Sequence, residues 1–159
     1  MINWILRTFT TRKVRPMMTL YKSMVIPLLD YCSQLWNPSQ KGEIQSLEEI
    51  QRAFTRKIDG LKGMSYWERL EKLSLYSLER RRERYGALYC WKIINNQAPN
   101  VNQKIQTKYN SRRGRLCLIP PLAKTASARI KSIRENSFSV RGQKLFNILP
   151  KDTRSHDVT

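Results

Sequence analysis

The sequence predicts a mainly α-helical protein, in which a small bundle of four or five helices is followed by a loosely structured basic segment and a C-terminal helix. Three observations lead to this fold class. Apolar residues recur at helical spacing through residues 1–98. That periodicity disappears in residues 99–135, a basic and loop-rich stretch, and returns in residues 136–150, where we expect a docking helix. Residues 151–159 form a polar tail, and no internal repeat is visible.

The central helix is expected over residues 77–96. Leu78, Tyr85, Leu88 and Tyr89 share one face, which is typical of a half-buried helix. Beyond Gly86 the helix is apolar on nearly all sides, and such a segment belongs inside a bundle. The first half instead carries a run of arginines, and cations at a helix N-terminus oppose the helix dipole.

Two helices are expected before residue 37. The first spans residues 2–9, and the second begins at Pro16, a residue that suits the first helical position. The second keeps one apolar face through the kink expected at Pro27, and Asn37 and Pro38 close it. The residues of this face are Met17, Leu20, Tyr21, Met24, Leu28, Tyr31, Cys32 and Leu35.

Two further helices complete the expected bundle. The helix over residues 41–59 carries its acids early and its bases late, in agreement with its dipole, and Gly60 stops it. Its expected buried residues are Ile44, Leu47, Gln51, Phe54 and Ile58. The sequence Ser65-Tyr66-Trp67-Glu68 is a capping box that opens a short helix ending at residue 73. Tyr66 and Trp67 are therefore expected in the core rather than as stacking platforms for bases, and the spacing of Tyr31 and Trp36 also favours packing.

The C-terminal third alternates between loops and short elements. Residues 112–115 form a basic turn, residues 116–119 are compatible with a short strand, and residues 124–134 are small, polar and basic. The last helix has an apolar stripe that contains Phe138, Gly142, Leu145 and Leu149. Asn136 or Ser137 caps it, Pro150 ends it, and we expect it to dock on the bundle.

Positive charge is the dominant feature of the composition. The chain has 30 Lys and Arg against 12 Asp and Glu, a formal charge of +18, and residues 101–159 hold 13 basic and 3 acidic side chains. A protein this basic usually binds nucleic acid or, less often, an anionic membrane surface. No segment reaches the roughly 20 apolar residues of a membrane-spanning helix, and no membrane partner is expected.

The rarer residues exclude several kinds of site. Cys32, Cys90 and Cys117 are an odd number at wide spacing, which disfavours both a disulfide framework and a zinc site. The single histidine, His156, lies in the polar tail, so neither a catalytic triad nor a His-rich metal site can be built around it. No cofactor or metal is therefore expected.

The cysteines favour a reducing intracellular compartment, the nucleus or cytoplasm, although the acid-free, basic first 29 residues resemble a mitochondrial presequence.

Several strings resemble one family. Residues 20–23 (LYKS) and 25–38 (VIPLLDYCSQLWNP) are similar to the segment that follows the catalytic core in jockey-like non-LTR retrotransposon reverse transcriptases. Two further segments of that family are similar at particular residues: 47–48, 51–52 and 61, and then 65–66, 68–70, 73, 75 and 77–82, where the sequence is SLERRR. Residues 134–139, 141 and 146–150 resemble its closing motif, although Phe146 and Glu135 stand where the family more often has Trp and Lys. The resemblance covers nearly the whole chain.

The resemblance implies the thumb and C-terminal part of a polymerase, a set of helices that grips a template–primer duplex by its backbone. Fingers and palm would lie upstream, where paired aspartates hold two divalent metals. This sequence has only Asp30, Asp59, Asp152 and Asp157, none of them adjacent, and no carboxylate–histidine cluster of an endonuclease. The chain is thus expected to be non-catalytic, with RNA or an RNA–DNA hybrid as partner. An upstream polymerase palm is a further partner to expect if the reading frame is truncated.

Two groups of cations are the candidate contacts to phosphates, which are sequence-independent. The group expected to hold the backbone of a duplex is Arg80, Arg81, Arg82 and Arg84. The group expected to hold a second strand or flap is Arg112, Arg113, Arg115, Arg129, Lys131 and Arg134. A solvated face with Glu79–Arg82 and Arg80–Glu83 pairs is the plainer interpretation of the first group. Other interpretations remain open: a co-opted helical protein-interaction module, a mitochondrial basic protein, or a translated remnant without a role.

Overall fold

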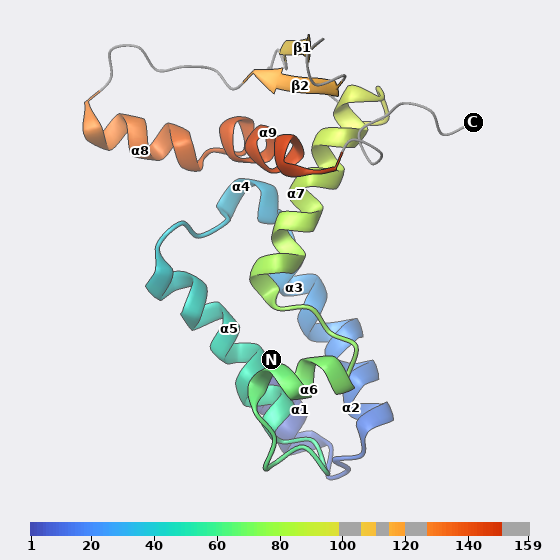
Figure 1. The fold of residues 1–159 in the computed structure, drawn as a ribbon. Coiled ribbons are helices and arrows are strands. Elements are labelled where there is room, and N and C mark those ends of the chain that lie inside the picture. Colours follow the sequence, from blue (N-terminus) through green and yellow to red (C-terminus); the bar gives the residue numbers. More distant parts are fainter. Residues whose placement is uncertain (99–105, 111–114, 120–126, 151–159) are drawn as a thin grey trace. The chain divides into compact units, whose positions relative to one another are not determined.

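The computed structural model describes residues 1–98, 106–110, 115–119 and 127–150, and it confirms the mainly helical fold class (Figure 1). The chain forms two compact units, Met1–Arg82 (unit 1) and Glu83–Thr159 (unit 2). The division lies inside helix α7 (Leu78–Ile94) and not near residue 98, where the periodicity of the sequence ends. Each unit has its own apolar core.

Unit 1 is built from short helices around one core. In chain order they are α1 (Ile2–Thr8), α2 (Val14–Leu20), the π-helix η1 (Tyr21–Val25), α3 (Ile26–Asp30), α4 (Ser33–Trp36), α5 (Lys41–Arg56), α6 (Tyr66–Lys72) and the first turn of α7. Tyr21 and Phe54, both fully buried, stack with their ring centroids 4.7 Å apart at the centre of this core. Ile58 at the end of α5 and Leu78 at the start of α7 extend it.

The backbone of the second predicted helix changes geometry just before Pro27, a residue without an N–H to donate to the preceding turn. The N–H of Ile26 donates to the carbonyl of Tyr21, five residues back, so the turn before Pro27 is a π-turn. Beyond it the prediction of one helix to residue 35 is wrong. The chain leaves helical geometry at Tyr31 (ψ 124°) and at Cys32, whose φ of 50° is left-handed. The short helix α4 follows this break.

The expected apolar face is not buried from residue 28 to residue 35 in the way that the stripe predicts. Tyr31 is 75% exposed and Leu35 is 84% exposed, and Leu28 and Cys32 are exposed as well, so their assignment to a buried face was wrong. Before the break the pattern holds at Met17 and Tyr21, which are completely buried, but it already fails at Leu28 in α3. The helical stripe therefore predicts burial correctly at the start of this segment, and it fails before the helix ends.

The next two helices agree closely with the sequence prediction. Helix α5 ends at Arg56, and Gly60 has a φ of 77°, which suits a residue without Cβ. The capping box that opens α6 is present, because the Ser65 hydroxyl accepts from the Glu68 N–H while the Glu68 carboxylate accepts from the Ser65 N–H. Of the two aromatic residues in this box, Tyr66 is buried as expected, whereas Trp67 is exposed.

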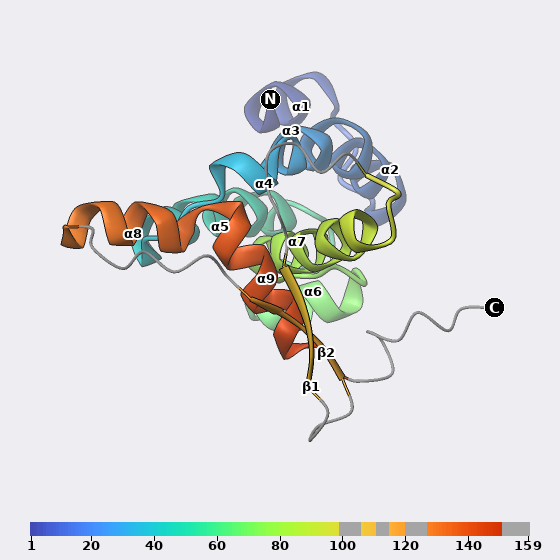
Figure 2. The same ribbon diagram turned by 90° about the horizontal axis from the view of Figure 1, so that it is seen from above.

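Unit 2 combines the rest of α7 with a hairpin and two helices: β1 (Gln106–Asn110), β2 (Arg115–Ile119), α8 (Ala128–Asn136) and α9 (Phe138–Ile148). The two strands are antiparallel and β2 lies beside α9 (Figure 2). The side chain of Asn147 links α9 to β2. Its Oδ1 accepts from the Leu118 N–H at 2.9 Å, and its Nδ2 donates to the Leu118 carbonyl at 2.8 Å. This side chain satisfies the backbone of β2 as a neighbouring strand would.

Helix α8 corrects the expectation of a loose segment up to residue 135. Its residues include good helix formers such as Ala128, Arg129 and Lys131, and Ser127 stands at the N-cap position. Periodicity could not reveal it, because the side chains that the structure describes in α8 are exposed, Ile130 and Ile133 among them. The cap that begins α9 is Ser137, one of the two predicted residues.

Close packing joins α7 and α9 within unit 2. A Cβ added at Gly142 would lie 2.8 Å from the Sγ atom of Cys90, so only glycine fits without a shift. Cys90 is buried, and burial raises the pKa of its thiol to about 11. The α7 segment after Gly86 is less enclosed than its composition suggested, because Leu88 is exposed.

Within the described ranges, no helix is long and apolar enough to cross a membrane. The same residues contain no cluster of His, Cys, Asp and Glu that is arranged to hold a metal ion. Cys32, Cys90 and Cys117 are all free thiols.

Candidate nucleic-acid interface

A buried polar network in unit 1 holds the start of α7, the helix that carries the predicted arginines. Its centre is Glu48 of α5, which is buried. The Leu78 N–H donates to the two carboxylate oxygens of Glu48 at 2.9 and 3.3 Å, and the Tyr66 hydroxyl also donates to this carboxylate. A carboxylate at this position accepts a hydrogen bond from a helix N–H that has no partner within the helix, and its negative charge stabilises the positive end of the helix dipole.

Gln51, one turn after Glu48, extends the network. Its Oε1 accepts from the Tyr21 hydroxyl at 2.8 Å, and its Nε2 donates to the Tyr66 hydroxyl at 2.9 Å and to the Tyr76 carbonyl at 3.0 Å. Burial and the neighbouring Glu48 carboxylate raise the pKa of the phenols of Tyr21 and Tyr66 well above the ordinary value. Both phenols consequently remain protonated donors.

Two of the predicted arginines interact with side chains of earlier helices: Arg81 is half-buried and Arg82 is buried. The Nε of Arg81 forms an ion pair with Asp30 of α3 at 2.7 Å. Arg82 is only 6% exposed, and its guanidinium carbon lies 5.5 Å from the ring centroid of Trp36. Burial lowers the pKa of Arg82, and the carboxylates of Asp30 and Glu48 counteract that effect. The Nε and Nη2 atoms of Arg82 are buried without a hydrogen-bond partner among the described residues.

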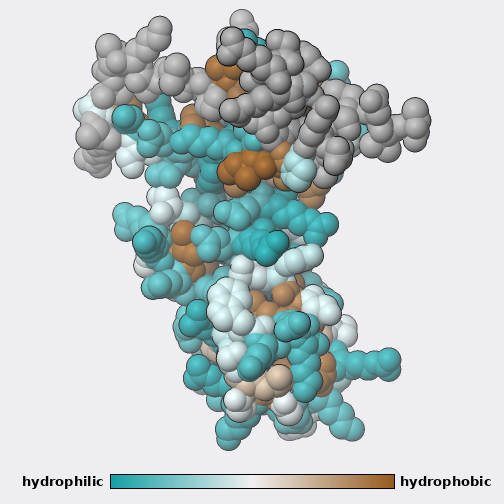
Figure 3. All heavy atoms as spheres, in the orientation of Figure 1, coloured by the Kyte–Doolittle hydropathy of each residue, from teal (hydrophilic) through white to brown (hydrophobic). Residues whose placement is uncertain are grey.

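Arg80 is the exposed member of the predicted group in unit 1. Its guanidinium lies 5.9 Å from the ring centroid of Tyr76, which is itself exposed. A cation beside an exposed aromatic ring can contact a phosphate while the ring remains available to a base. The described residues on the face seen in Figure 3 are mostly hydrophilic, interrupted by small hydrophobic patches.

Unit 2 carries the remaining predicted contacts. Arg84 on α7 and Lys131 and Arg134 on α8 are exposed. Arg115 begins β2 and Arg129 lies in α8, but their side chains are outside what the structure describes. Arg112 and Arg113 also lie outside the described residues. Within each unit, therefore, the structure provides some exposed cations from the predicted set.

Sequence reasoning missed the residues that determine which arginines are accessible. Asp30, Trp36, Glu48 and Gln51 belong to three earlier helices, and only tertiary structure brings them to the start of α7. One signal was available: a Glu and a Gln three residues apart on the apolar face of α5 indicate a buried polar pair.

Comparisons with known proteins give no further assignment. No protein-family model, curated protein or solved structure matches this chain. The resemblance to a reverse transcriptase thumb therefore stays a prediction from the sequence strings.

Proposed function

We propose that this chain is a non-catalytic, reverse-transcriptase-like fragment that binds RNA or an RNA–DNA hybrid through its phosphates, without sequence specificity. The observation that carries the proposal is the formal charge of +18, combined with exposed cations in both units. Clustered Lys and Arg attract a polyanion, and binding releases the counterions condensed on it.

The contacts at the start of α7 support this proposal because they distinguish arginines with side-chain partners in earlier helices from cations that stay exposed. Arg81 and Arg82 are taken up by Asp30 and Trp36, so they act as supports and not as direct contacts. Arg80 in unit 1 and Arg84, Lys131 and Arg134 in unit 2 remain exposed and form the revised set of direct contacts.

The proposal predicts affinity for an RNA–DNA hybrid that falls steeply with salt. Filter binding at a series of salt concentrations gives the slope of log affinity against log salt, which scales with the number of phosphates that the protein neutralises. Changing Arg80, Arg84, Lys131 and Arg134 together to Gln should lower the magnitude of that slope by up to about 0.9 for each phosphate of a duplex that is no longer neutralised. The helical circular dichroism signal should remain unchanged, because all four side chains are exposed.

A control with the same change of charge separates direct contacts from general attraction. Lys22, Lys72, Lys92 and Lys144 are exposed and belong to neither predicted group. Changing these four to Gln should reduce binding much less than the first variant does. Equal effects of the two variants would show that the chosen cations are not the contacts, and a salt-independent affinity would contradict the phosphate-binding proposal itself.

A helical protein-interaction module is the second candidate function. The exposed apolar side chains of Leu28, Tyr31, Leu35 and Trp36 in and between α3 and α4 favour it, since large exposed apolar patches often mark protein contacts. The response to salt distinguishes the two candidates, because an apolar protein contact persists at salt concentrations that release a phosphate chain.

A further inference from the structure

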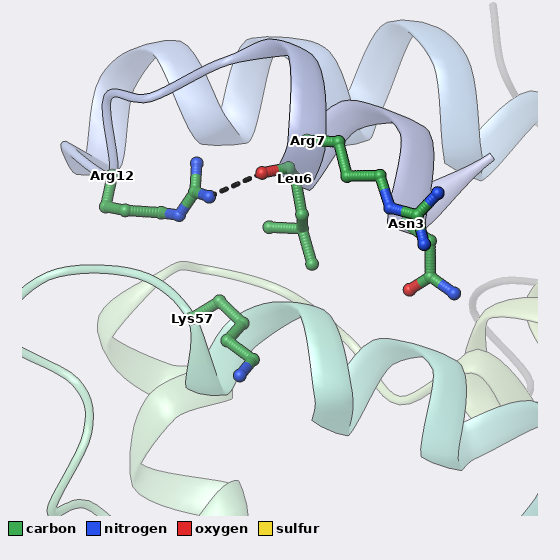
Figure 4. A pocket seen from close by; sticks show the side chains of 5 residues that line it. All are labelled: Asn3, Leu6, Arg7, Arg12 and Lys57. Atoms are coloured by element: carbon green, nitrogen blue, oxygen red, sulfur yellow. Dashed lines mark hydrogen bonds between the residues drawn. The ribbon is translucent and has the colours of Figure 1, made fainter.

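A second basic feature of unit 1 lies away from the arginines of α7. A hollow of about 390 Å³ is lined by Asn3, Leu6 and Arg7 of α1, by Arg12 in the following turn, and by Lys57 at the end of α5. In Figure 4, Arg12 and Arg7 lie on either side of Leu6, and Lys57 lies on the facing segment with its amino group directed away from Arg12 in this view. The volume is within the roughly 300–1,000 Å³ range of ligand pockets.

The lining is cationic and contains no carboxylate. Arg7, Arg12 and Lys57 all line one hollow, and the remaining polar group is the amide of Asn3. Like charges that line one hollow repel one another, and an anion bound there would relieve that repulsion.

Arg12 has a structural role that also fixes its position. Its Nη2 donates to the Leu6 carbonyl at 2.7 Å, and its Nη1 donates to the carbonyls of Phe9 and Thr11. These bonds satisfy the carbonyls at the end of α1 and hold the guanidinium at the pocket. The positive charge is therefore preorganised there, at no further cost in side-chain entropy.

Helix capping does not explain the other two cations. The side chains of Arg7 and Lys57 are exposed and form no hydrogen bond or ion pair with other described residues. Lys57 also lines a neighbouring hollow of about 360 Å³, where Arg56 and Lys62 add positive charge and Asp59 is the one acid. A row of cations thus continues beyond the first pocket.

We propose that the pocket formed by Arg7, Arg12 and Lys57 binds a phosphate group, with a phosphodiester of a bound nucleic-acid strand as its source. This inference rests on the proposed function and adds a contact that neither predicted group contains. Arg12 supplies a fixed guanidinium, and the exposed side chains of Arg7 and Lys57 supply two further positive charges at the same hollow. The neighbouring hollow offers Arg56 and Lys62 to the next phosphate, which favours a chain over a single ion.

The test changes Arg7 and Lys57 together to Gln and leaves Arg12 intact, because Arg12 is needed to cap α1. Binding of a short single-stranded oligouridylate and of sodium tripolyphosphate is measured by titration calorimetry at several salt concentrations. With the oligonucleotide, the salt slope should fall by about 0.7 for each phosphate that the variant no longer neutralises. The control, Lys22 and Lys72 both changed to Gln, removes the same charge from exposed sites of unit 1 that do not line the pocket.

Each outcome decides a different point. Weaker oligonucleotide binding and a lower slope in the pocket variant alone support the inference. If only tripolyphosphate binding weakens, the pocket takes a free polyphosphate and the nucleic-acid source is wrong. If the pocket variant and the control behave alike, the pocket is not a contact, while the proposed function stands. A wild-type chain that binds neither the oligonucleotide nor an RNA–DNA hybrid contradicts the proposed function, and the tripolyphosphate titration then tests the pocket independently.

Discussion

Glu48 connects three segments of unit 1 through one carboxylate. It lies on α5, receives the Tyr66 hydroxyl from α6, and receives the Leu78 N–H from the first turn of α7. The buried Arg82 is close enough for the Glu48 charge to act on its pKa. An isolated buried carboxylate is costly, but this one is hydrogen-bonded on both oxygens and lies near a buried cation.

Replacing Glu48 with Gln should therefore destabilise unit 1 by about 1–3 kcal/mol. The amide puts an NH2 donor in place of one carboxylate oxygen. With that donor at the Oε2 position, the Leu78 N–H keeps only its longer bond of 3.3 Å to Oε1; with the donor at the Oε1 position, it faces the Tyr66 hydroxyl. In either orientation Arg82 is deprived of a compensating charge. Urea unfolding followed by circular dichroism measures the destabilisation. Glu49 is the matched control because it is exposed, and Glu49→Gln should change the free energy of unfolding by less than about 0.5 kcal/mol. Equal effects would show that the network contributes no stability.

Helices α7 and α9 approach so closely that a single methyl group should disturb unit 2. In Gly142→Ala the new Cβ would lie 2.8 Å from both the Cys90 Sγ and the Phe138 Cε2 atoms. Overpacking of this kind costs about 1–3 kcal/mol. Hydrogen exchange of the α9 amides measures the effect inside unit 2, and exchange should become faster.

Gly42→Ala provides the comparison for Gly142→Ala. Gly42 also lies in a helix, α5, but no atom lies within 4 Å of a Cβ added there. This change should leave α9 exchange unchanged and stabilise unit 1 by about 0.4–1 kcal/mol. Unchanged protection of α9 in Gly142→Ala would mean that the helices can separate without cost.

Elements that bury an apolar face were predictable from the sequence, and the others were not. The capping box at Ser65, the N-cap at Ser137 and the stripe through Phe54 and Ile58 all depend on local spacing, and all were confirmed. The helix break at Cys32 depends on a left-handed backbone at a residue that is neither Gly nor Asn, which composition does not signal.

The same limit applies to the candidate site. The accessible and the buried arginines of residues 80–82 are adjacent in sequence and chemically identical. What distinguishes them is the ion pair of Arg81 with Asp30 and the contact of Arg82 with the ring of Trp36. Both partners lie more than 40 residues away in the sequence. The pocket at Arg7 and Lys57 also joins distant segments, so the sequence analysis assigned its cations no common role.

For the whole molecule, the excess of positive charge should work against folding when no polyanion is present. At pH 7 the formal charge is +18, and self-repulsion of this kind favours expanded states. Added NaCl screens the repulsion over a Debye length of about 10 Å at 0.1 M and 3 Å at 1 M. The melting temperature should therefore rise with salt, by about 2–4 °C for each 1 kcal/mol of repulsion relieved.

The variant in which Lys22, Lys72, Lys92 and Lys144 are Gln tests the cause of this rise. It has four fewer positive charges, all of them from exposed sites, so its melting temperature should start higher in low salt and respond less to NaCl. Differential scanning calorimetry of the two proteins across the same salt series makes the comparison. An identical salt response would assign the stabilisation to a general effect of salt on apolar burial, because that effect does not depend on the charge of the protein. A melting temperature that falls with salt would show that the cations are already compensated within the fold, and the surface charge would then be unable to drive the capture of a phosphate chain.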